Sequence, residues 1–446
     1  MPSGKSAYME SISDKHNRIL SHHKATLRHV VGALNKLSLE LDVTKLPDQL
    51  HLLVIGKGSQ ILLEAFTRIY KGEIMDGIVF SPKPNLIRNN NERIKKLSFF
   101  TGTHPLPSFE NEATTLEILK FIHDLPTGAS LVCLISGGTS SLLCLPPDSI
   151  SMHELQITYQ ILLESGASIE EINTVRKHLS LVKGGNLAQK AHNLKLHTYL
   201  LSDVPHDKPE IIGSGPTVTD MTTFSDSLQV LNDYNLNQVL PSSVLNYLHQ
   251  GVQGQHPETP KPGLSDHPNQ KIHLINGAKI IQPFLGSVLD EQGFVVHWAT
   301  DPIQGLVKKE THRIAAEVVS VLNGKSEISS KIPQAIVYHG ESYVDVTGTG
   351  KGGRNQELAL HLALSLEGQH PVSILTLATD GVDGPTDAAG ALVSSLTTSH
   401  ARKQNTLPEF YIQQNDSYHF HERMKTLVKT GPTGNNLMDL CVVLVG

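Results

Sequence analysis

The chain has 446 residues, of which 39% are hydrophobic and 18% are charged, as in a globular protein too long for one ordinary core. A net charge of −6 and a pI near 6.5 give no electrostatic case for binding nucleic acid or an anionic membrane. No apolar run reaches the length of a membrane span, the N-terminus lacks the apolar core of a signal peptide, and three cysteines are too few for a disulfide framework. We therefore expect a cytoplasmic protein of two or three domains.

Short apolar, β-branched runs alternate with helical patterns along the chain, which is typical of α/β proteins. In the first half we expect four strands, at 52–55, 77–81, 130–135 and 196–201, and helices at 60–70, 111–123 and 141–145. A polar stretch at 251–270 is the predicted linker between domains. In the second half we expect strands at 272–275, 294–298, 335–338, 343–346, 373–377 and 440–445, and helices at 278–292, 308–322 and 356–366.

Ligands of open parallel sheets bind beyond the carboxyl ends of the strands, and several loops of this chain follow strands directly. Lys57 lies in Gly56-Lys57-Gly58-Ser59, where it is either a point charge for a phosphate or a solvated lysine in a turn. The next such loop is Ser136-Gly137-Gly138-Thr139-Ser140. Its hydroxyls exceed what a helix cap needs, so we interpret it as a site for an anion.

The middle of the chain carries two further loops with charged side chains. Arg176, Lys177 and Lys183 cluster positive charge near Gly184 and Gly185, either on a solvated helix face or at a ligand. Asp203 follows the strand at 196–201. It either meets a hard cation such as Mg²⁺ or closes an Asx turn.

The C-terminal half contains a glycine-rich loop directly before a predicted helix. Gly348, Gly350, Gly352 and Gly353 accompany Lys351 and Arg354, and this combination suits a phosphate or carboxylate, although a tight turn is the alternative.

Farther along, Asp380, Asp383 and Asp387 share one loop after an apolar strand. Three carboxylates repel one another unless a cation or hydrogen bonds offset them. We therefore expect a metal-binding or base role for at least one.

Together these loops fit phosphoryl transfer, which needs glycine loops, positive charge, a metal ion and a carboxylate near the attacking hydroxyl. None of them matches a Walker A motif or the protein-kinase set. The predicted nucleotide site is therefore of another type.

The ordered set of motifs resembles the class II glycerate kinases, whose C-terminal part is called the MOFRL domain. The resemblance spans about residues 52–446, and its motifs are Thr103-His-Pro-Leu-Pro107, Ser136-Gly-Gly-Thr-Ser-Ser-Leu-Leu143, Asn173-Thr-Val-Arg-Lys-His-Leu-Ser180, Lys183-Gly-Gly185, Ser202-Asp-Val-Pro205, Gly213-Ser-Gly-Pro-Thr217, Gly350-Lys-Gly-Gly-Arg-Asn-Gln-Glu-Leu358, Thr379-Asp-Gly-Val-Asp-Gly-Pro-Thr-Asp-Ala-Ala-Gly390 and Thr433-Gly-Asn-Asn436 with Asp439.

This resemblance implies an α/β fold with two domains and an active site in the cleft between them. We place an N-terminal Rossmann-like domain with a mostly parallel sheet at 1–250 and a smaller C-terminal α/β domain of the MOFRL type at 271–446. The implied reaction transfers the γ-phosphoryl group of ATP to D-glycerate, mainly at the 2-hydroxyl. D-glycerate and ATP are thus the expected partners, with Mg²⁺ as the metal. A homodimer is left open.

The family's suggested catalytic charges fall on Lys57 and Arg354. We add Asp203 as a third catalytic group and Asp380 as a metal ligand, although either aspartate could hold the metal or accept the hydroxyl proton. The residues assigned to ligand binding are Ser136, Gly137, Gly138, Thr139, Ser140, Lys183, Gly350, Gly352 and Gly353.

The chain departs from the family pattern at His206, where a glycine usually follows Ser-Asp-Val-Pro. Two alternatives to the kinase follow from the sequence. One is an NAD(P)-dependent reductase of hydroxypyruvate or tartronate semialdehyde, for which the first loop lacks the third glycine of Gly-x-Gly-x-x-Gly and has Ile61 there. The other is a sugar-acid or nucleotide sensor without catalysis.

Overall fold

The computed structural model describes residues 12–34, 37, 39–82, 92–202, 208–325, 333–369, 371–433 and 437–446. By contacts the chain divides into two compact units. We call Ser38–Gly277 the parallel-sheet unit, and Met1–Leu37 with Ala278–Thr433 and Leu437–Gly446 the mixed-sheet unit. Among the described helices, none combines the length and apolar character needed to cross a membrane.

The parallel-sheet unit is built on six parallel strands in the order β3-β2-β1-β4-β5-β6. Strand order reverses between β1 and β4, the switch point at which open α/β sheets bind ligands. The strands are β1 (Gln49–Ile55), β2 (Glu73–Ser81), β3 (Leu97–Thr101), β4 (Ser130–Ile135), β5 (Lys195–Ser202) and β6 (Gln270–Asn276).

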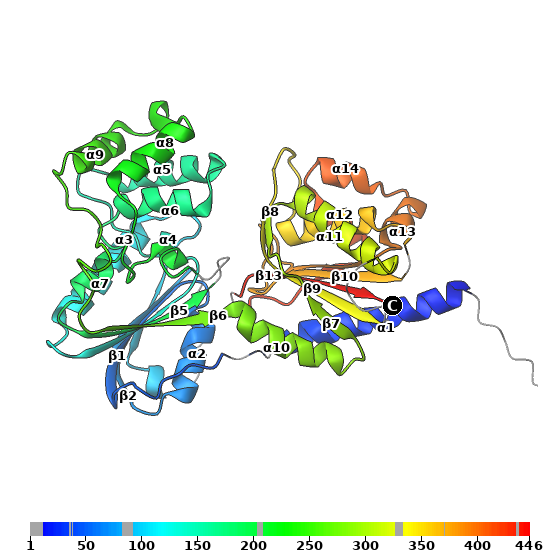
Figure 1. Cartoon of the computed structure of the whole chain (residues 1–446), viewed down its shortest axis with the longest axis horizontal. Coiled ribbons are helices and arrows are strands. Elements are labelled where there is room, and N and C mark those ends of the chain that lie inside the picture. The colour runs from blue at the N-terminus through cyan, green and yellow to red at the C-terminus, as the bar shows by residue number, and fades with distance from the viewer. Residues whose placement is uncertain are drawn as a thin grey trace, which may run out of the picture. The chain divides into compact units, whose positions relative to one another are not determined.

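Two groups of helices belong to this unit (Figure 1), and α3, α4 and α7 of the first pack on a different apolar core from the helices of the second. The first accompanies the sheet and comprises α2 (Ser59–Ile69), α3 (Phe109–Asp124), α4 (Thr139–Leu142) and α7 (Asn186–Lys190). The second forms a helical cluster beyond the α4 end of the sheet, made of α5 (Met152–Glu164), α6 (Ile169–His178), α8 (Phe224–Asp233) and α9 (Ser242–Val252). Single 3₁₀ turns lie at Glu92–Ile94, Ile212–Ser214 and Leu236–Gln238.

The mixed-sheet unit contains seven strands in the order β12-β11-β10-β13-β9-β7, with β8 also paired to β9. Parallel pairing joins β7 and β8 to β9, and the other pairs are antiparallel. The strands are β7 (Val295–Trp298), β8 (Ile303–Leu306), β9 (Gln334–Tyr343), β10 (Val372–Ala378), β11 (Gly390–Ser394), β12 (Leu427–Val428) and β13 (Asp439–Val445).

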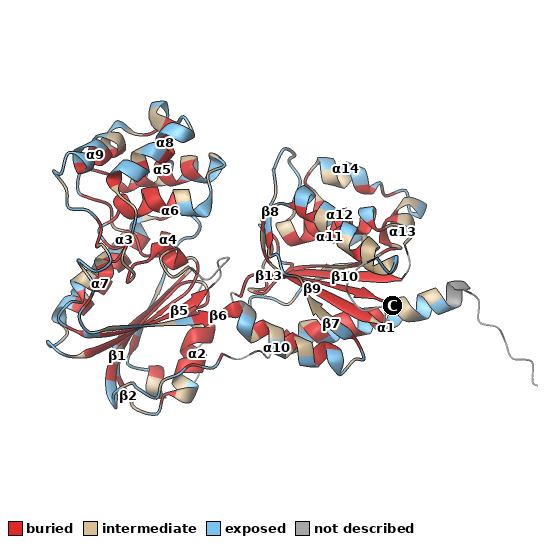
Figure 2. Ribbon diagram, viewed as in Figure 1, coloured by how far each residue is buried: buried red, intermediate tan, exposed pale blue. Residues whose placement is uncertain are grey.

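Helices cover both faces of this second sheet, with α1 and α10 on one side and α11 and α12 on the other (Figure 1). The bounds are α1 (Ile12–Leu34), α10 (Gly277–Asp290), α11 (Val307–Leu322), α12 (Arg354–Ser365), α13 (Thr397–Lys403), α14 (Pro408–Gln413) and α15 (Ser417–Met424). Because both faces are covered, β10 and β13 are buried along their whole lengths, as Figure 2 shows in red.

The predicted α/β fold is confirmed, and β4 has the bounds expected from its apolar run. The separate strand predicted at 343–346 is wrong. β9 continues from the predicted strand at 335–338 as far as Tyr343, and Val344 and Val346 follow it outside any strand, with Val346 exposed.

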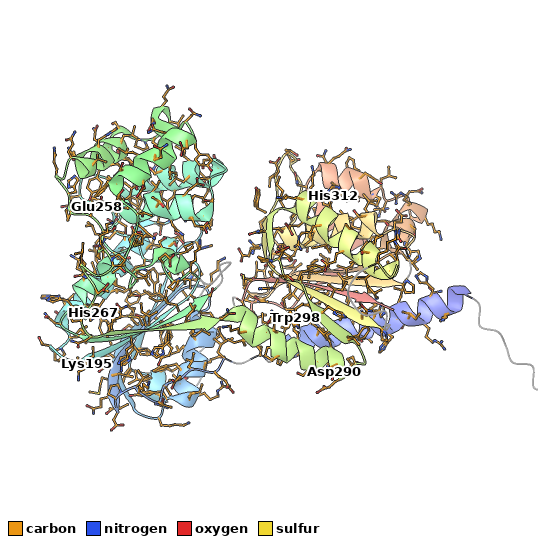
Figure 3. The ribbon with its side chains drawn as sticks, in the orientation of Figure 1. Lys195, Glu258, His267, Asp290, Trp298 and His312 are labelled. Carbon is orange, nitrogen blue, oxygen red and sulfur yellow. The ribbon has the colours of Figure 1, made fainter. Side chains whose placement is uncertain are left out.

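The polar stretch predicted as a linker packs instead on the parallel-sheet unit. Glu258 accepts a hydrogen bond from the N–H of Phe224 (3.0 Å), and the ring of His267 lies 3.0 Å from the carbonyl of Ala191. Figure 3 labels both residues beside that unit. Polar composition here reflects hydrogen bonding rather than a free connection, and the contact-based division falls at Gly277.

Two elements are grouped differently from the sequence boundaries 1–250 and 271–446. Helix α1 belongs by contacts to the mixed-sheet unit, and β6 belongs to the parallel-sheet unit as its edge strand. Local composition could not reveal either assignment, since both depend on partners far along the chain.

Candidate active site

The loops after β1 and β4 are bonded to each other at the switch point of the parallel sheet. The N–H of Lys57 donates to the carbonyl of Gly137 (2.8 Å), and the N–H of Gly58 donates to the hydroxyl of Ser136 (2.9 Å). Ser136 and Thr139 are buried. The N–H groups of Lys57 and Gly58 therefore hold the loop after β4 in place. The loop after β1 can still offer a ligand the side chain of Lys57.

The loop after β4 keeps its own donors. Among the described residues, nothing accepts from the backbone N–H groups of Gly137, Gly138, Thr139 or Ser140. Gly138 has φ +82°, and a Cβ there would lie 2.8 Å from Cγ of Lys57. Glycine is therefore required for this loop and Lys57 to approach each other. The result is a set of N–H groups, without acceptors in the described part of the chain, beside a lysine side chain.

His104 borders the same place, since its Cδ2 lies 3.3 Å from the position of a Cβ on Gly138. Crowding by protein atoms and the positive charges of Lys57 and Arg176 lower the pKa of His104 below its usual value. The residue nevertheless remains exposed at the surface. It thus presents a neutral imidazole beside Lys57 at neutral pH.

The motifs at 173–185 and 213–217 are hydrogen-bonded to the loop after β4 and to each other. The hydroxyls of Ser140 and Ser214 are 2.7 Å apart, and Ser214 donates to the amide oxygen of Asn173 (2.7 Å). The backbone N–H of Gly184 donates to the carbonyl of Ser214 (3.0 Å). Motifs that are distant in sequence are therefore joined in one hydrogen-bonded framework.

Lys183, assigned to ligand binding from the sequence, is completely buried and donates to the carbonyl of Leu143 (2.6 Å). Burial lowers its pKa to about 8. In the structure its ammonium group stabilises the backbone just after α4. It therefore contacts a backbone carbonyl and is not accessible to solvent.

In the mixed-sheet unit, the glycine-rich loop is packed against the connection between α14 and α15. The N–H of Gly350 donates to the carbonyl of Gln414 (2.8 Å), and the N–H of Lys351 donates to the carboxylate of Asp416 (2.9 Å). A Cβ on Gly352 would overlap the hydroxyl of Ser417. The glycines permit close packing. The N–H groups of Gly350 and Lys351, which we expected to bind an anion, donate to protein atoms instead.

The helix that follows begins at Arg354 and is capped from another loop. Asp383 accepts from the backbone N–H groups of Asn355 (3.0 Å) and Gln356 (2.8 Å), which occupies the start of α12. Burial raises the pKa of Asp383 to about 6, although these hydrogen bonds favour its charged form. Asp383 is thus explained as a helix cap.

Arg354 itself is held by two carboxylates. Its Nε lies 2.5 Å from Asp439, and its Nη2 lies 2.9 Å from Glu341. Burial opposes the charge, but these two carboxylates outweigh it and raise the pKa of Arg354 well above its usual value. The guanidinium is therefore fixed in orientation and always charged.

Three comparisons place the chain among known proteins. Residues 14–249 match a family described as "Domain of unknown function (DUF4147)", and residues 334–439 match the MOFRL family. A D-glycerate 2-kinase from Thermotoga maritima is 36% identical over 89% of this chain and 91% of its own length. The chain belongs to the class II glycerate kinase family.

The fold agrees with this family of kinases. A crystal structure of glycerate kinase from Thermotoga maritima, 33% identical, matches with a TM-score of 0.76 over 97% of this chain and 100% of its own. A relative in Agrobacterium vitis, 33% identical over 88% of this chain and 86% of its own length, is named "Putative hydroxypyruvate reductase".

Kinases use Mg²⁺ together with ATP. Which described carboxylates could bind this ion depends on the hydrogen bonds that they already accept. No group of three or more histidine, cysteine, aspartate or glutamate residues suited to a metal occurs in the described part of the chain. Asp380 closes an Asx turn, accepting from the N–H of Val382 (2.9 Å) through one oxygen. Its second oxygen suits a Mg²⁺ ion that is held mainly by nucleotide phosphates and water. Asp203 and His206 lie outside the described residues.

The sequence did not assign a role to several residues that hold the candidate loops within each unit of this glycerate kinase family member. Glu341 and the capping role of Asp383 have no local signal, because their partners are distant in the chain. Ser214 carried a signal in its Gly-Ser-Gly surroundings, where Gly213, Ser214 and Gly215 all have positive φ.

Proposed function

We propose that this protein is an ATP-dependent kinase that phosphorylates D-glycerate at the 2-hydroxyl. The observation that supports the proposal most strongly is the side chain of Lys57 beside N–H groups that no described residue accepts from, at the carboxyl ends of β1 and β4. Such donors stabilise the charge that develops on a phosphoryl group during transfer. The similarity to a D-glycerate 2-kinase supplies the acceptor.

In this reaction the acceptor oxygen forms a bond to the γ-phosphorus, the bond from that phosphorus to the bridging oxygen breaks, and ADP leaves. Lys57 and the N–H groups of Gly137–Ser140 would bind the nonbridging oxygens or the acceptor carboxylate. Arg354 would carry a further fixed positive charge toward the phosphoryl group. Mg²⁺, when bound with ATP near Asp380, would neutralise phosphate charge. Asp203 would accept the hydroxyl proton.

The reductase alternative needs a dinucleotide fold in which the first loop binds pyrophosphate through its N–H groups. Here those of Lys57 and Gly58 already donate to Gly137 and Ser136. Ile61, at the position of the third fingerprint glycine, is buried. Both observations weigh against that alternative.

The test measures two reactions of the same purified protein side by side. With ATP, Mg²⁺ and D-glycerate we expect ADP and phosphoglycerate in equal amounts, and with NADH and hydroxypyruvate we expect no loss of NADH absorbance. Loss of at least about 100-fold in kcat for Lys57→Met would support its charge-stabilising role. NADH consumption without ADP formation would overturn the proposal in favour of the reductase.

A further inference from the structure

The last turn of α6 carries three consecutive basic residues, and their partners differ. Lys177 forms an ion pair with Asp220 (3.1 Å), and His178 lies 3.1 Å from Glu258. No described carboxylate lies within ion-pair distance of Arg176, and its guanidinium lies over an aromatic ring without a hydrogen bond to any described residue. Two of the three basic groups are therefore neutralised within the unit, and the third is not.

Arg176 is nevertheless almost enclosed, with 6% of its surface exposed. Its Nε is fully buried and has no hydrogen-bond partner, and the same holds for the hydroxyl of Tyr159, on whose ring the guanidinium rests at 4.6 Å. The terminal nitrogens also lack a protein partner but are not among the enclosed atoms, so they keep contact with solvent.

A buried guanidinium without a counterion is costly, and proteins normally satisfy it with carboxylates or hydrogen bonds. The surrounding charges increase this cost. Besides burial, the charge of Arg176 lowers the pKa of His104 and of Lys183, and burial lowers the pKa of Arg176 itself. An anion bound from outside would offset the cost, and the free N–H groups of Gly137–Ser140 lie in the same framework.

We propose that Arg176 binds the carboxylate of the acceptor and so selects 2-hydroxy acids over neutral alcohols. This proposal rests on the proposed function and names the group that recognises its substrate. A guanidinium stacked on a ring offers its free edge, where two parallel N–H groups match the two oxygens of a carboxylate. Arg176 is buried, whereas Lys57 is partly exposed. The small acceptor therefore suits Arg176 better than the larger nucleotide does.

The test compares Arg176→Met and Arg176→Lys with the unaltered chain. We expect Arg176→Met to raise the KM and the dissociation constant for D-glycerate about 100-fold, while the KM for ATP changes by less than about 3-fold. Arg176→Lys keeps the positive charge but loses the two parallel N–H groups of the guanidinium. It should therefore raise the KM and the dissociation constant for D-glycerate by less than Arg176→Met does. Preference for D-glycerate over D-glyceramide, which lacks the negative charge, should shrink in both variants.

Arg313→Lys is the matched control. Arg313 also stacks on a tyrosine, Tyr338 at 5.6 Å, but it is paired with Glu310 (2.6 Å), so we expect unchanged constants for D-glycerate. A rise in the KM for ATP with D-glycerate unaffected would assign Arg176 to a phosphate and overturn the proposal. Equal constants for all proteins would assign it a purely structural role and also overturn it.

Binding separates this proposal from the proposed function. If the unaltered chain forms no phosphoglycerate, the proposed function fails. Stabilisation of the unaltered chain by D-glycerate in a thermal shift, absent in Arg176→Met, would still support the subsite. If Arg176→Met does not fold, Arg176→Lys decides through the same constants, and unchanged D-glycerate binding in that variant would contradict the proposal.

Discussion

At the residue scale, Gly138 shows why a small side chain matters at this site. Its φ of +82° and its proximity to Lys57 mean that a methyl group would strain the backbone and displace the lysine. The sequence indicated a glycine pair for anion binding there, and the structure adds that Gly138 also makes room for Lys57.

We expect Gly138→Ala to reduce kcat with D-glycerate at least about 10-fold while costing about 1 kcal/mol of stability. Gly128→Ala is the control, because Gly128 has φ +81° but no atom within 4 Å of an added Cβ. It should lose similar stability and keep its activity. Steady-state kinetics and chemical denaturation measure both. Equal activity of the two variants would show that the contact with Lys57 does not matter.

At the element scale, apolar patterns predicted most strands within a few residues of their observed bounds. β1, β4, β10 and β13 are buried runs rich in leucine, valine and isoleucine, so composition alone identifies them. Helices α5, α8 and α9 of the helical cluster were not predicted, and neither was the packing of residues 253–269, since both depend on distant contacts.

The same distinction applies to the candidate site. Which loops follow strands is a local property, and the loops at Lys57 and Ser136 were predicted on that basis. The cap that Asp383 provides for α12, the pairing of Arg354 with Glu341 and Asp439, and the burial of Lys183 depend on residues brought together only by folding. The roles proposed for Lys57, Arg354, Asp203 and Asp380 stay predictions.

Helix α15 is attached to the start of α12 by His421. Its ring contacts the carbonyl of Gln356 (2.8 Å) and the hydroxyl of Thr426 (2.8 Å), and the side chain is buried. Burial lowers the pKa of His421 to about 4. The neutral ring is thus favoured in the folded state. Because its folded pKa lies below its unfolded value of 6.5, stability is lost as the pH falls from about 6.5 to 4.

We expect His421→Gln, which can still donate to Gln356, to remove this dependence. Between pH 7 and pH 4 the unaltered chain should lose about 2 to 3 kcal/mol more unfolding free energy than the variant. The same change at His400, an exposed residue of α13, is the control for the substitution itself. Parallel curves for the unaltered chain and His421→Gln would contradict this account.

At the scale of the whole molecule, each unit buries apolar cores of its own. We therefore expect two cooperative transitions in calorimetry, with the mixed-sheet transition identified by its response to His421→Gln at pH 5. D-glycerate should raise the midpoint temperature of the parallel-sheet transition. At a concentration of 100 times its dissociation constant, it should add about 2.7 kcal/mol to the unfolding free energy of that unit. A single transition in which ligand and acid act together would contradict independent folding of the units.

The measurement that tests the central claim most directly is the identity of the product. Purified protein is incubated with ATP, Mg²⁺ and D-glycerate, and the product is examined by phosphorus–proton correlation NMR. Coupling of the phosphorus to the single proton on carbon 2 identifies 2-phosphoglycerate, which is the predicted result. Coupling to the two protons on carbon 3, or the absence of any phosphoglycerate, would contradict the claim.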